Sequence, residues 1–177
     1  MLLIDGDLVL RAIEHKDATL LKEMINNPEI EKMVIGWSLP VSEQKQIEWI
    51  NSLRADDIKY IIEIKGIAIG MSSITGLDFK NSVANLNIKI KNDEYKGKGI
   101  GTRTIKLLIK FCFDELNLHC LTANILEYNI LSQKLFEKCG FKKDGVLRSR
   151  VYKRGKYHDV YAYSLLRSDL ICDERNR

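Results

Sequence analysis

A short glycine-rich segment constrains the fold of this chain more than any other feature. Residues 97–102 read Gly-Lys-Gly-Ile-Gly-Thr and separate an alternating segment from a long apolar one. In the alternating segment, Leu86, Ile88 and Ile90 share one face of a predicted strand. Apolar residues recur through residues 99–116, as is typical of a buried helix. The order of strand, tight loop and helix therefore predicts an α/β unit whose loop brings main-chain N–H groups close to an anion.

The remaining segments are typical of strands and helices in one continuous domain. The predicted helices begin near residues 17, 42, 99 and 129, and Ser42 is the expected N-cap of the second. Lys65-Gly66 and Arg154-Gly155 are predicted two-residue hairpin turns. This order predicts an α/β domain with a mixed sheet over residues 1–167 and a polar, frayed tail over residues 168–177. The predicted strands cover residues 8–13, 60–64, 67–74, 84–90, 121–126, 146–152 and 157–166.

Composition excludes several classes of protein. The 177 residues carry 28 Lys and Arg against 24 Asp and Glu, a net charge of +4, unlike the basic surface of a dedicated nucleic-acid binder. No apolar run approaches the roughly 18 residues of a membrane span, and no secretory signal is recognisable. Four cysteines without a C-x-x-C spacing and three scattered histidines predict no metal site. We therefore expect a cytoplasmic protein without membrane or nucleic-acid partners, with Cys112 and Cys139 in its core.

Two blocks of the sequence resemble one enzyme family. Residues 96–101 are similar to the acyl-CoA pyrophosphate loop of the GNAT superfamily of N-acetyltransferases, although Lys96 stands where Gln or Arg is usual. Residues 129–141, with N-I-L-S at the start and G-F at the end, resemble the family's next helix and strand. Leu10-Arg11 and the segment 155–159 are similar to the branch that acetylates ribosomal proteins, polyamines and sugar-nucleotide amines. The resemblance implies a single GNAT-like domain of α/β (α+β) class, with a mixed, mostly antiparallel central sheet flanked by helices.

The resemblance also implies acetyl-CoA as co-substrate and a set of residues that bind it. The main chain of Ile88 and Ile90 would pair with the pantetheine arm like an added strand, and an N–H near Ile88 could stabilise the oxyanion. Asn129 would bond the arm near the thioester, and an N-cap role for Asn129 stays open beside this one. The implied binding residues are Ile88, Ile90, Lys96, Gly97, Lys98, Gly99, Ile100, Gly101, Thr102, Asn129 and Ser132.

The groups that would handle protons depart from the family pattern. Phe136 occupies the position of the usual Tyr general acid, so Ser132 is the candidate catalytic residue, either as a proton donor to the sulfur or as a packing serine. Asn85 occupies the position of the usual Glu base. Deprotonating a lysine-like amine at pH 7 costs about 4.6 kcal/mol, against about 1.4 kcal/mol for an amine with a pKa near 8. The sequence therefore favours an acceptor amine of low pKa.

The last predicted hairpin is strongly basic, and two interpretations of it stay open. Its charges could be a solvated edge that resists aggregation, or a wall for an anionic substrate. The second interpretation disfavours polyamines, which require acidic walls. The preferred acceptor is a small primary amine, an amino sugar or a nucleotide-linked amino sugar. The alternatives are a ribosomal-protein N-terminus, a polyamine or aminoglycoside, and a non-catalytic CoA-binding role. The basic residues are Arg148, Arg150, Lys153, Arg154 and Lys156.

Overall fold

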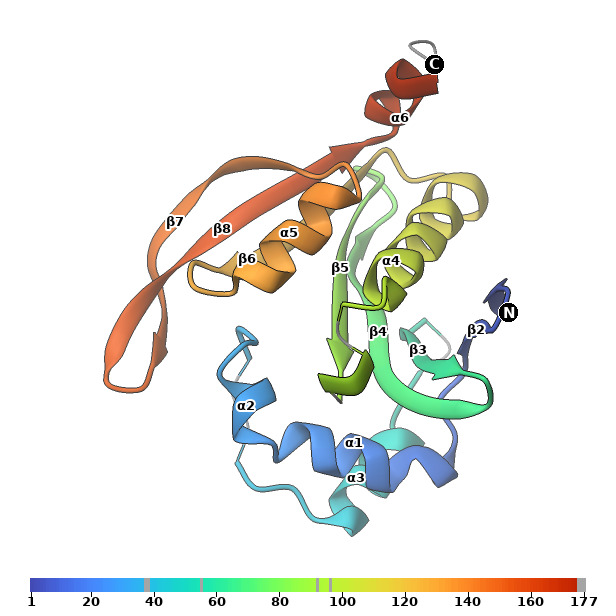
Figure 1. Ribbon diagram of the computed structural model, residues 1–177, viewed down its shortest axis with the longest axis vertical. Helices are drawn as coiled ribbons and strands as arrows, with labels where there is room; N and C mark the ends of the chain where they lie inside the picture. Colours follow the sequence, from blue (N-terminus) through green and yellow to red (C-terminus); the bar gives the residue numbers. More distant parts are fainter. Residues whose placement is uncertain (37–38, 55, 92, 96, 175–177) are drawn as a thin grey trace.

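One eight-stranded sheet organises the chain (Figure 1). The computed structural model describes residues 1–177 apart from 37–38, 55, 92, 96 and 175–177. The strand order is β1-β2-β3-β4-β5-β6-β8-β7, and every neighbouring pair is antiparallel except β5 with β6. The strands are β1 (Leu3–Asp5), β2 (Leu8–Arg11), β3 (Ile58–Ile64), β4 (Ile67–Asp78), β5 (Val83–Ile90), β6 (Cys120–Leu126), β7 (Lys142–Lys153) and β8 (Lys156–Leu166).

Helices flank this sheet, so the predicted mixed, mostly antiparallel α/β architecture is confirmed. A π-helical turn, η3 (Phe111–Glu115), extends the long helix after the glycine loop. No helix among the described residues is long and apolar enough to cross a membrane. The helices are α1 (Ala18–Ile25), α2 (Pro28–Glu31), α3 (Glu43–Asn51), α4 (Ile100–Lys110), α5 (Ile130–Lys138) and α6 (Arg167–Glu174), with short 3₁₀ turns η1 (His15–Asp17) and η2 (Asp93–Tyr95).

The local signals in the sequence correspond to local structure. Both predicted hairpin turns have two residues of positive φ, 49° and 78° at Lys65-Gly66 and 49° and 85° at Arg154-Gly155. That geometry matches the right-handed twist of the flanking strands. The side-chain oxygen of Ser42 accepts the N–H of Lys45 at 3.2 Å, so the predicted N-cap of α3 is confirmed. Cys112 and Cys139 are buried, as predicted.

Three elements differ from the sequence-based expectation. Strand β1 precedes the first predicted strand and pairs with β2. Helix α2 begins at Pro28, which stands at the first helical position, and the side chain of Asn27 caps it. Helix α6 occupies most of the tail that was expected to be frayed, and the Asp169 carboxylate accepts the N–H of Leu166 at its start. Each of these elements depends on a capping contact or a neighbouring strand rather than on a long periodic pattern.

The sheet has two covered faces, and the alternation of side chains along its strands assigns residues to them. Helices α4 and α5 pack on the face that presents Ile62 and Leu86 and form the larger core. Helices α1 and α3 pack on the other face, around Ile61, with Met71 of β4 beside them. The long β7–β8 hairpin extends away from the remainder of the sheet (Figure 1).

Candidate active site

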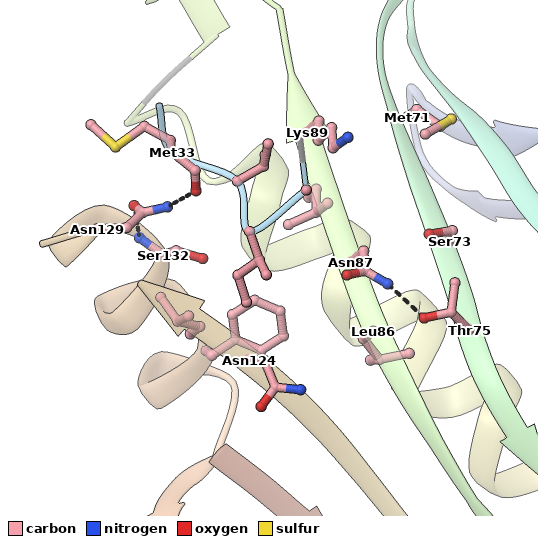
Figure 2. Close-up of a pocket in the computed structure, with 16 residues that line it drawn as sticks. Met33, Met71, Ser73, Thr75, Leu86, Asn87, Lys89, Asn124, Asn129 and Ser132 are labelled. Atoms are coloured by element: carbon pink, nitrogen blue, oxygen red, sulfur yellow. Dashed lines mark hydrogen bonds between the residues drawn. The ribbon is translucent and has the colours of Figure 1, made fainter. Parts of the chain in front are cut away.

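The site is an opening in the sheet between β5 and β6. These parallel strands pair over only three residue pairs, from Val83 with Cys120 to Asn85 with Thr122. Beyond Asn85 the strands diverge, and a cavity of about 360 Å³ lies between them. Figure 2 shows Asn87 of β5 and Asn124 of β6 on opposite sides of this opening. The divergence exposes one edge of β5 in the interior of the domain.

The exposed edge of β5 carries the main-chain groups of Ile88 and Ile90. The N–H of Lys91 donates to the carbonyl oxygen of Ile69 at 2.8 Å, so the odd-numbered residues of this stretch turn their main-chain groups toward β4. Because the main chain of a strand alternates with a period of two, Ile88 and Ile90 direct their N–H and C=O groups toward the opening. Their side chains lie on one face of the strand, as the alternation predicted, and pack against the core under α4. An extended ligand can pair with β5 here as an added strand.

The glycine loop opens a cradle at the start of α4. Gly97 and Gly99 have φ values of 76° and 77°, and a Cβ atom added to either would meet no heavy atom within 4 Å. The open space in front of these residues is therefore available to a ligand. Gly101 is different, because an added Cβ would lie 3.3 Å from the side chain of Leu135 in α5. Its missing side chain lets the two helices approach closely, while Lys96 falls outside the described residues.

The cradle fits a pyrophosphate group. The first intrahelical hydrogen bond of α4 runs from the N–H of Arg103 to the carbonyl of Gly99 at 3.0 Å, and no side chain in the described part of the chain caps the helix. The N–H groups of residues 100–102 therefore precede the helical bonding pattern and point to the cradle. The partial positive charge of a helix N-terminus favours an anion at this position. Lys98 lies beside the cradle, with its ammonium 5.8 Å from the ring centroid of Tyr95.

Ser132 and Asn129, at the start of α5, line the cavity (Figure 2). The side-chain oxygen of Asn129 accepts the N–H of Ser132 at 3.1 Å, and its amide nitrogen donates to the carbonyl of Met33 at 2.9 Å. Asn129 is thus the N-cap of α5 and a tie to another segment, while its contact with CoA stays a prediction. The hydroxyl of Ser132 has no hydrogen-bond partner among the described residues and lines the cavity beside buried Phe136.

The wall of the cavity that β4 and β5 form carries side-chain amides. Asn85, at the position of the usual Glu base, belongs to this amide cluster. The side-chain nitrogen of Asn87 donates to the Thr75 hydroxyl at 2.9 Å, and that of Asn85 donates to the Asn87 side chain at 3.2 Å. No acidic residue lines this cavity among the described residues. Glu63, a possible base acting through water, instead accepts from Arg11 at 2.6 Å. Among the described residues this wall therefore carries no carboxylate, and Lys89 of β5 is the charged side chain on it.

Among the described cysteines, neither the positions nor the pKa values fit a nucleophile that would carry the acetyl group at this site. Among the described residues, no thiol lines the cavity. Burial raises the pKa of Cys112 to about 12 and that of Cys139 to about 11, so both are protonated at neutral pH. The arrangement therefore fits direct attack of an amine on a bound acyl donor rather than transfer through a cysteine.

Side-chain contacts between distant parts of the chain hold one wall of the cavity. These contacts are called the clamp, and no pattern in the sequence predicted them. Residues 33–36 line the cavity, and side chains from distant strands hold the main chain of this segment and of the residues just before it. The buried ammonium of Lys153 donates to the carbonyls of Glu31 and Gly36 at 2.8 and 3.0 Å and binds the Glu31 carboxylate. The Tyr128 hydroxyl donates to the Lys32 carbonyl at 2.6 Å. The hairpin turn of β7–β8 is therefore attached to the cavity wall.

Replacing Lys153 by Met should loosen this clamp. The substitution leaves two carbonyls and a carboxylate without their donor, and we expect it to cost about 2 kcal/mol of unfolding free energy. We expect the KM for the acceptor to rise on the order of 10-fold while the affinity for acetyl-CoA is retained, because the clamp faces the acceptor side. Thermal denaturation and steady-state kinetics measure both effects. Lys156→Met, an exposed change in the same hairpin, is the control, and equal effects of the two variants would contradict the role of the clamp.

Comparison with known proteins agrees with this geometry. The acetyltransferase (GNAT) domain family model matches residues 7–142. The chain is 30% identical over 168 residues to the uncharacterized N-acetyltransferase p20 of Bacillus licheniformis, covering 92% of this chain and 94% of the relative. It is 29% identical over 174 residues to the putative ribosomal N-acetyltransferase YdaF of Bacillus subtilis (strain 168), covering 94% of each.

A solved structure extends the agreement to the whole fold. The spermidine N-acetyltransferase of Vibrio cholerae, crystallised with CoA and spermine, superposes with a TM-score of 0.84 at 25% identity, covering 94% of this chain and 99% of that one. The predicted family and co-substrate are confirmed by these matches. With its open β5 edge and glycine cradle, the chain belongs to the GNAT family and is an acetyl-CoA-dependent N-acetyltransferase.

Proposed function

We propose that the enzyme acetylates the primary amine of a small amino sugar or of a nucleotide-linked amino sugar. The observation that carries the proposal is the cavity wall without a carboxylate among the described residues, where Thr75, Asn85 and Asn87 are hydrogen-bonded to one another. A wall without a carboxylate favours an amine that loses its proton readily, as an amine with a pKa near 8 does. The basic hairpin supports an acceptor that also carries phosphate, since Lys153 attaches its turn to the cavity wall.

In this proposal the two substrates reach the opening from the two faces of the sheet. The amine nitrogen attacks the carbonyl carbon of acetyl-CoA, the C–N bond forms and the C–S bond breaks. The amine loses its proton to solvent, and CoA leaves as a thiolate that takes up a proton. The N–H of Ile88, on the exposed edge of β5, is placed to stabilise negative charge on the carbonyl oxygen. The cradle at Gly97 and Gly99 holds the pyrophosphate on the α4 side. The acceptor amine enters from the α1–α3 side, past residues 33–36.

The names of two relatives point to other acceptors, and the test therefore includes them. YdaF is named as a putative ribosomal N-acetyltransferase, and the Vibrio cholerae enzyme was crystallised with spermine. Thiol release from acetyl-CoA should be measured with glucosamine, a uridine-diphosphate amino sugar, spermidine and a peptide with a free N-terminus. We expect the highest kcat/KM with an amino sugar. Turnover confined to spermidine or to the peptide would overturn the proposal.

Replacing Ser132 by Ala tests its role as the general acid. If the unpartnered hydroxyl donates a proton to the departing sulfur, kcat should fall on the order of 10- to 100-fold, at the low end for an acid because a thiol is a fair leaving group. The KM for acetyl-CoA should change little, and the solvent isotope effect on kcat should decrease. Leu131→Ala, an exposed change one residue away, is the control. A variant with lower thermal stability and unchanged kcat would show that Ser132 only packs.

A further inference from the structure

Lys89 occupies the junction of three hollows on the acceptor side of the sheet. It lines the active-site cavity of about 360 Å³, a second hollow of about 350 Å³ beside α1 and α3, and a third of about 120 Å³ beside α2. On β5 it stands directly opposite Met71 of β4, on the face that α1 and α3 cover. Figure 2 shows Lys89 on β5 beyond Asn87, near Met71. An acceptor bound between these walls therefore lies close to the ammonium group of Lys89.

The ammonium of Lys89 has no carboxylate partner among the described residues. The nearby Glu31 binds Lys153, and Lys91 farther along the same strand pairs with Glu23. Lys89 is half-buried, and burial together with the positive charge of Lys153 lowers its pKa. A partly buried cation without a partner destabilises the free protein, because burial removes water that nothing replaces. The surroundings of Lys89 are therefore electrostatically incomplete.

An anionic group on the acceptor would supply the negative charge that the surroundings of Lys89 lack. We infer that Lys89 is the specificity-determining residue that binds a carboxylate or phosphate carried by the acceptor amine, and that it selects against polyamines. This inference rests on the proposed acetyl transfer and deepens it by naming the charge of the acceptor. A polycation entering the cavity would meet Lys89 and Lys45, both of which line the adjoining hollow, with no acid there among the described residues. An anion gains a charge-assisted hydrogen bond in a partly desolvated pocket.

Matched acceptor pairs test this inference. Acetyl transfer should be measured with glucosamine against glucosamine 6-phosphate, tyramine against tyrosine, and spermidine. The first pair tests a phosphate and the second a carboxylate, so together they show which anion is preferred. We expect the wild-type kcat/KM to favour at least one anionic member, and Lys89→Met to lower that preference on the order of 10- to 100-fold while sparing the neutral partner. Equal use of both members of each pair by the wild type, or a preference for spermidine, would overturn the inference.

Two further variants separate anion binding from other roles of Lys89. Lys89→Arg keeps the positive charge but does not accept a proton at neutral pH, so it should retain the preference if Lys89 binds an anion. Loss of all activity in Lys89→Arg, with normal folding, would instead assign Lys89 as a base and overturn the inference. Lys91→Met, which removes a charge already paired with Glu23, is the matched control and should leave the preference unchanged.

A stability measurement provides a readout that does not depend on turnover. Without acceptor, Lys89→Met should unfold at a higher temperature than the wild type, because it removes a partly buried cation that has no partner. Glucosamine 6-phosphate should raise the melting temperature of the wild type in the presence of CoA more than glucosamine does. A lower melting temperature for Lys89→Met and no difference between the two sugars would overturn the inference.

Transfer to tyrosine alone would contradict the amino-sugar proposal and support anion recognition by Lys89. Transfer to neutral amino sugars alone would support the amino-sugar proposal and contradict anion recognition by Lys89.

Discussion

Substitution of Gly99 by Ala should abolish most acetyl-CoA binding while leaving the protein folded. Gly99 has a φ of 77°, where a Cβ atom costs on the order of 1 kcal/mol, and the added methyl would stand in the cradle that the pyrophosphate requires. We expect the dissociation constant of acetyl-CoA to rise on the order of 100-fold, the loss expected for two charge-assisted hydrogen bonds. Isothermal titration calorimetry on the folded variant measures this change.

Gly66 is a matched control for backbone strain. Its φ is 78°, and an added Cβ would meet no heavy atom within 4 Å, as at Gly99, but it lies in the β3–β4 turn. Gly66→Ala should therefore lose a similar free energy of unfolding and bind acetyl-CoA normally. If both variants lost the same affinity, strain rather than occupation of the cradle would explain the result, and the placement of the pyrophosphate would be wrong.

Substitution of Gly70 by Ala should have the largest effect on the active site without touching any ligand. An added Cβ would lie 2.2 Å from the carbonyl oxygen of Lys89 and 3.0 Å from the Cα of Ile90, both main-chain atoms. Strand β5 would have to move by about 1 Å, which costs about 3 kcal/mol in overpacking. Because we propose that this strand presents the N–H of Ile88 to the reacting carbonyl, the misplacement should lower kcat/KM on the order of 100-fold.

Gly145→Ala is the control for this prediction. Gly145 also lies in a strand, β7, and an added Cβ there would meet no heavy atom within 4 Å. We expect near-normal stability and activity from this variant in chemical denaturation and steady-state assays. A Gly70→Ala protein as stable and active as Gly145→Ala would show that β5 accommodates the methyl group, and that its position is not critical for transfer.

The parts of the fold that the sequence predicted are those with short-range causes. Alternation predicted that Leu86, Ile88 and Ile90 share one face of a strand, and in the structure that face packs against the core under α4. The glycine pattern at residues 97–101 predicted a tight loop before a long helix, and two of its glycines adopt positive φ. The same alternation put Lys89 on the opposite face with Asn85, but a polar residue on a strand is usually solvent-exposed, so no pattern in the sequence distinguishes Lys89.

Other parts of the site depend on contacts between residues far apart in the chain. The clamp joins Lys153 to Glu31 and Gly36, and Tyr128 to Lys32, across about a hundred residues of sequence. In the sequence, Lys153 was one of five basic hairpin residues, and only the structure distinguishes it as buried. The divergence of β5 from β6 likewise follows from pairing partners, since β6 continues along β8 while β5 continues along β4.

The sequence by itself therefore determined the strand–loop–helix unit and the family, and it predicted a phosphate cradle in the loop, because backbone dihedral preferences and side-chain periodicity act over a few neighbouring residues. Only the tertiary structure decided which main-chain groups of β5 face an opening, which lysine is neutralised by Glu31, and which lysine, Lys89, is left without a partner among the described residues. The physical reason is that electrostatic pairing and burial are set by distances in space, and these depend on how the whole sheet is assembled.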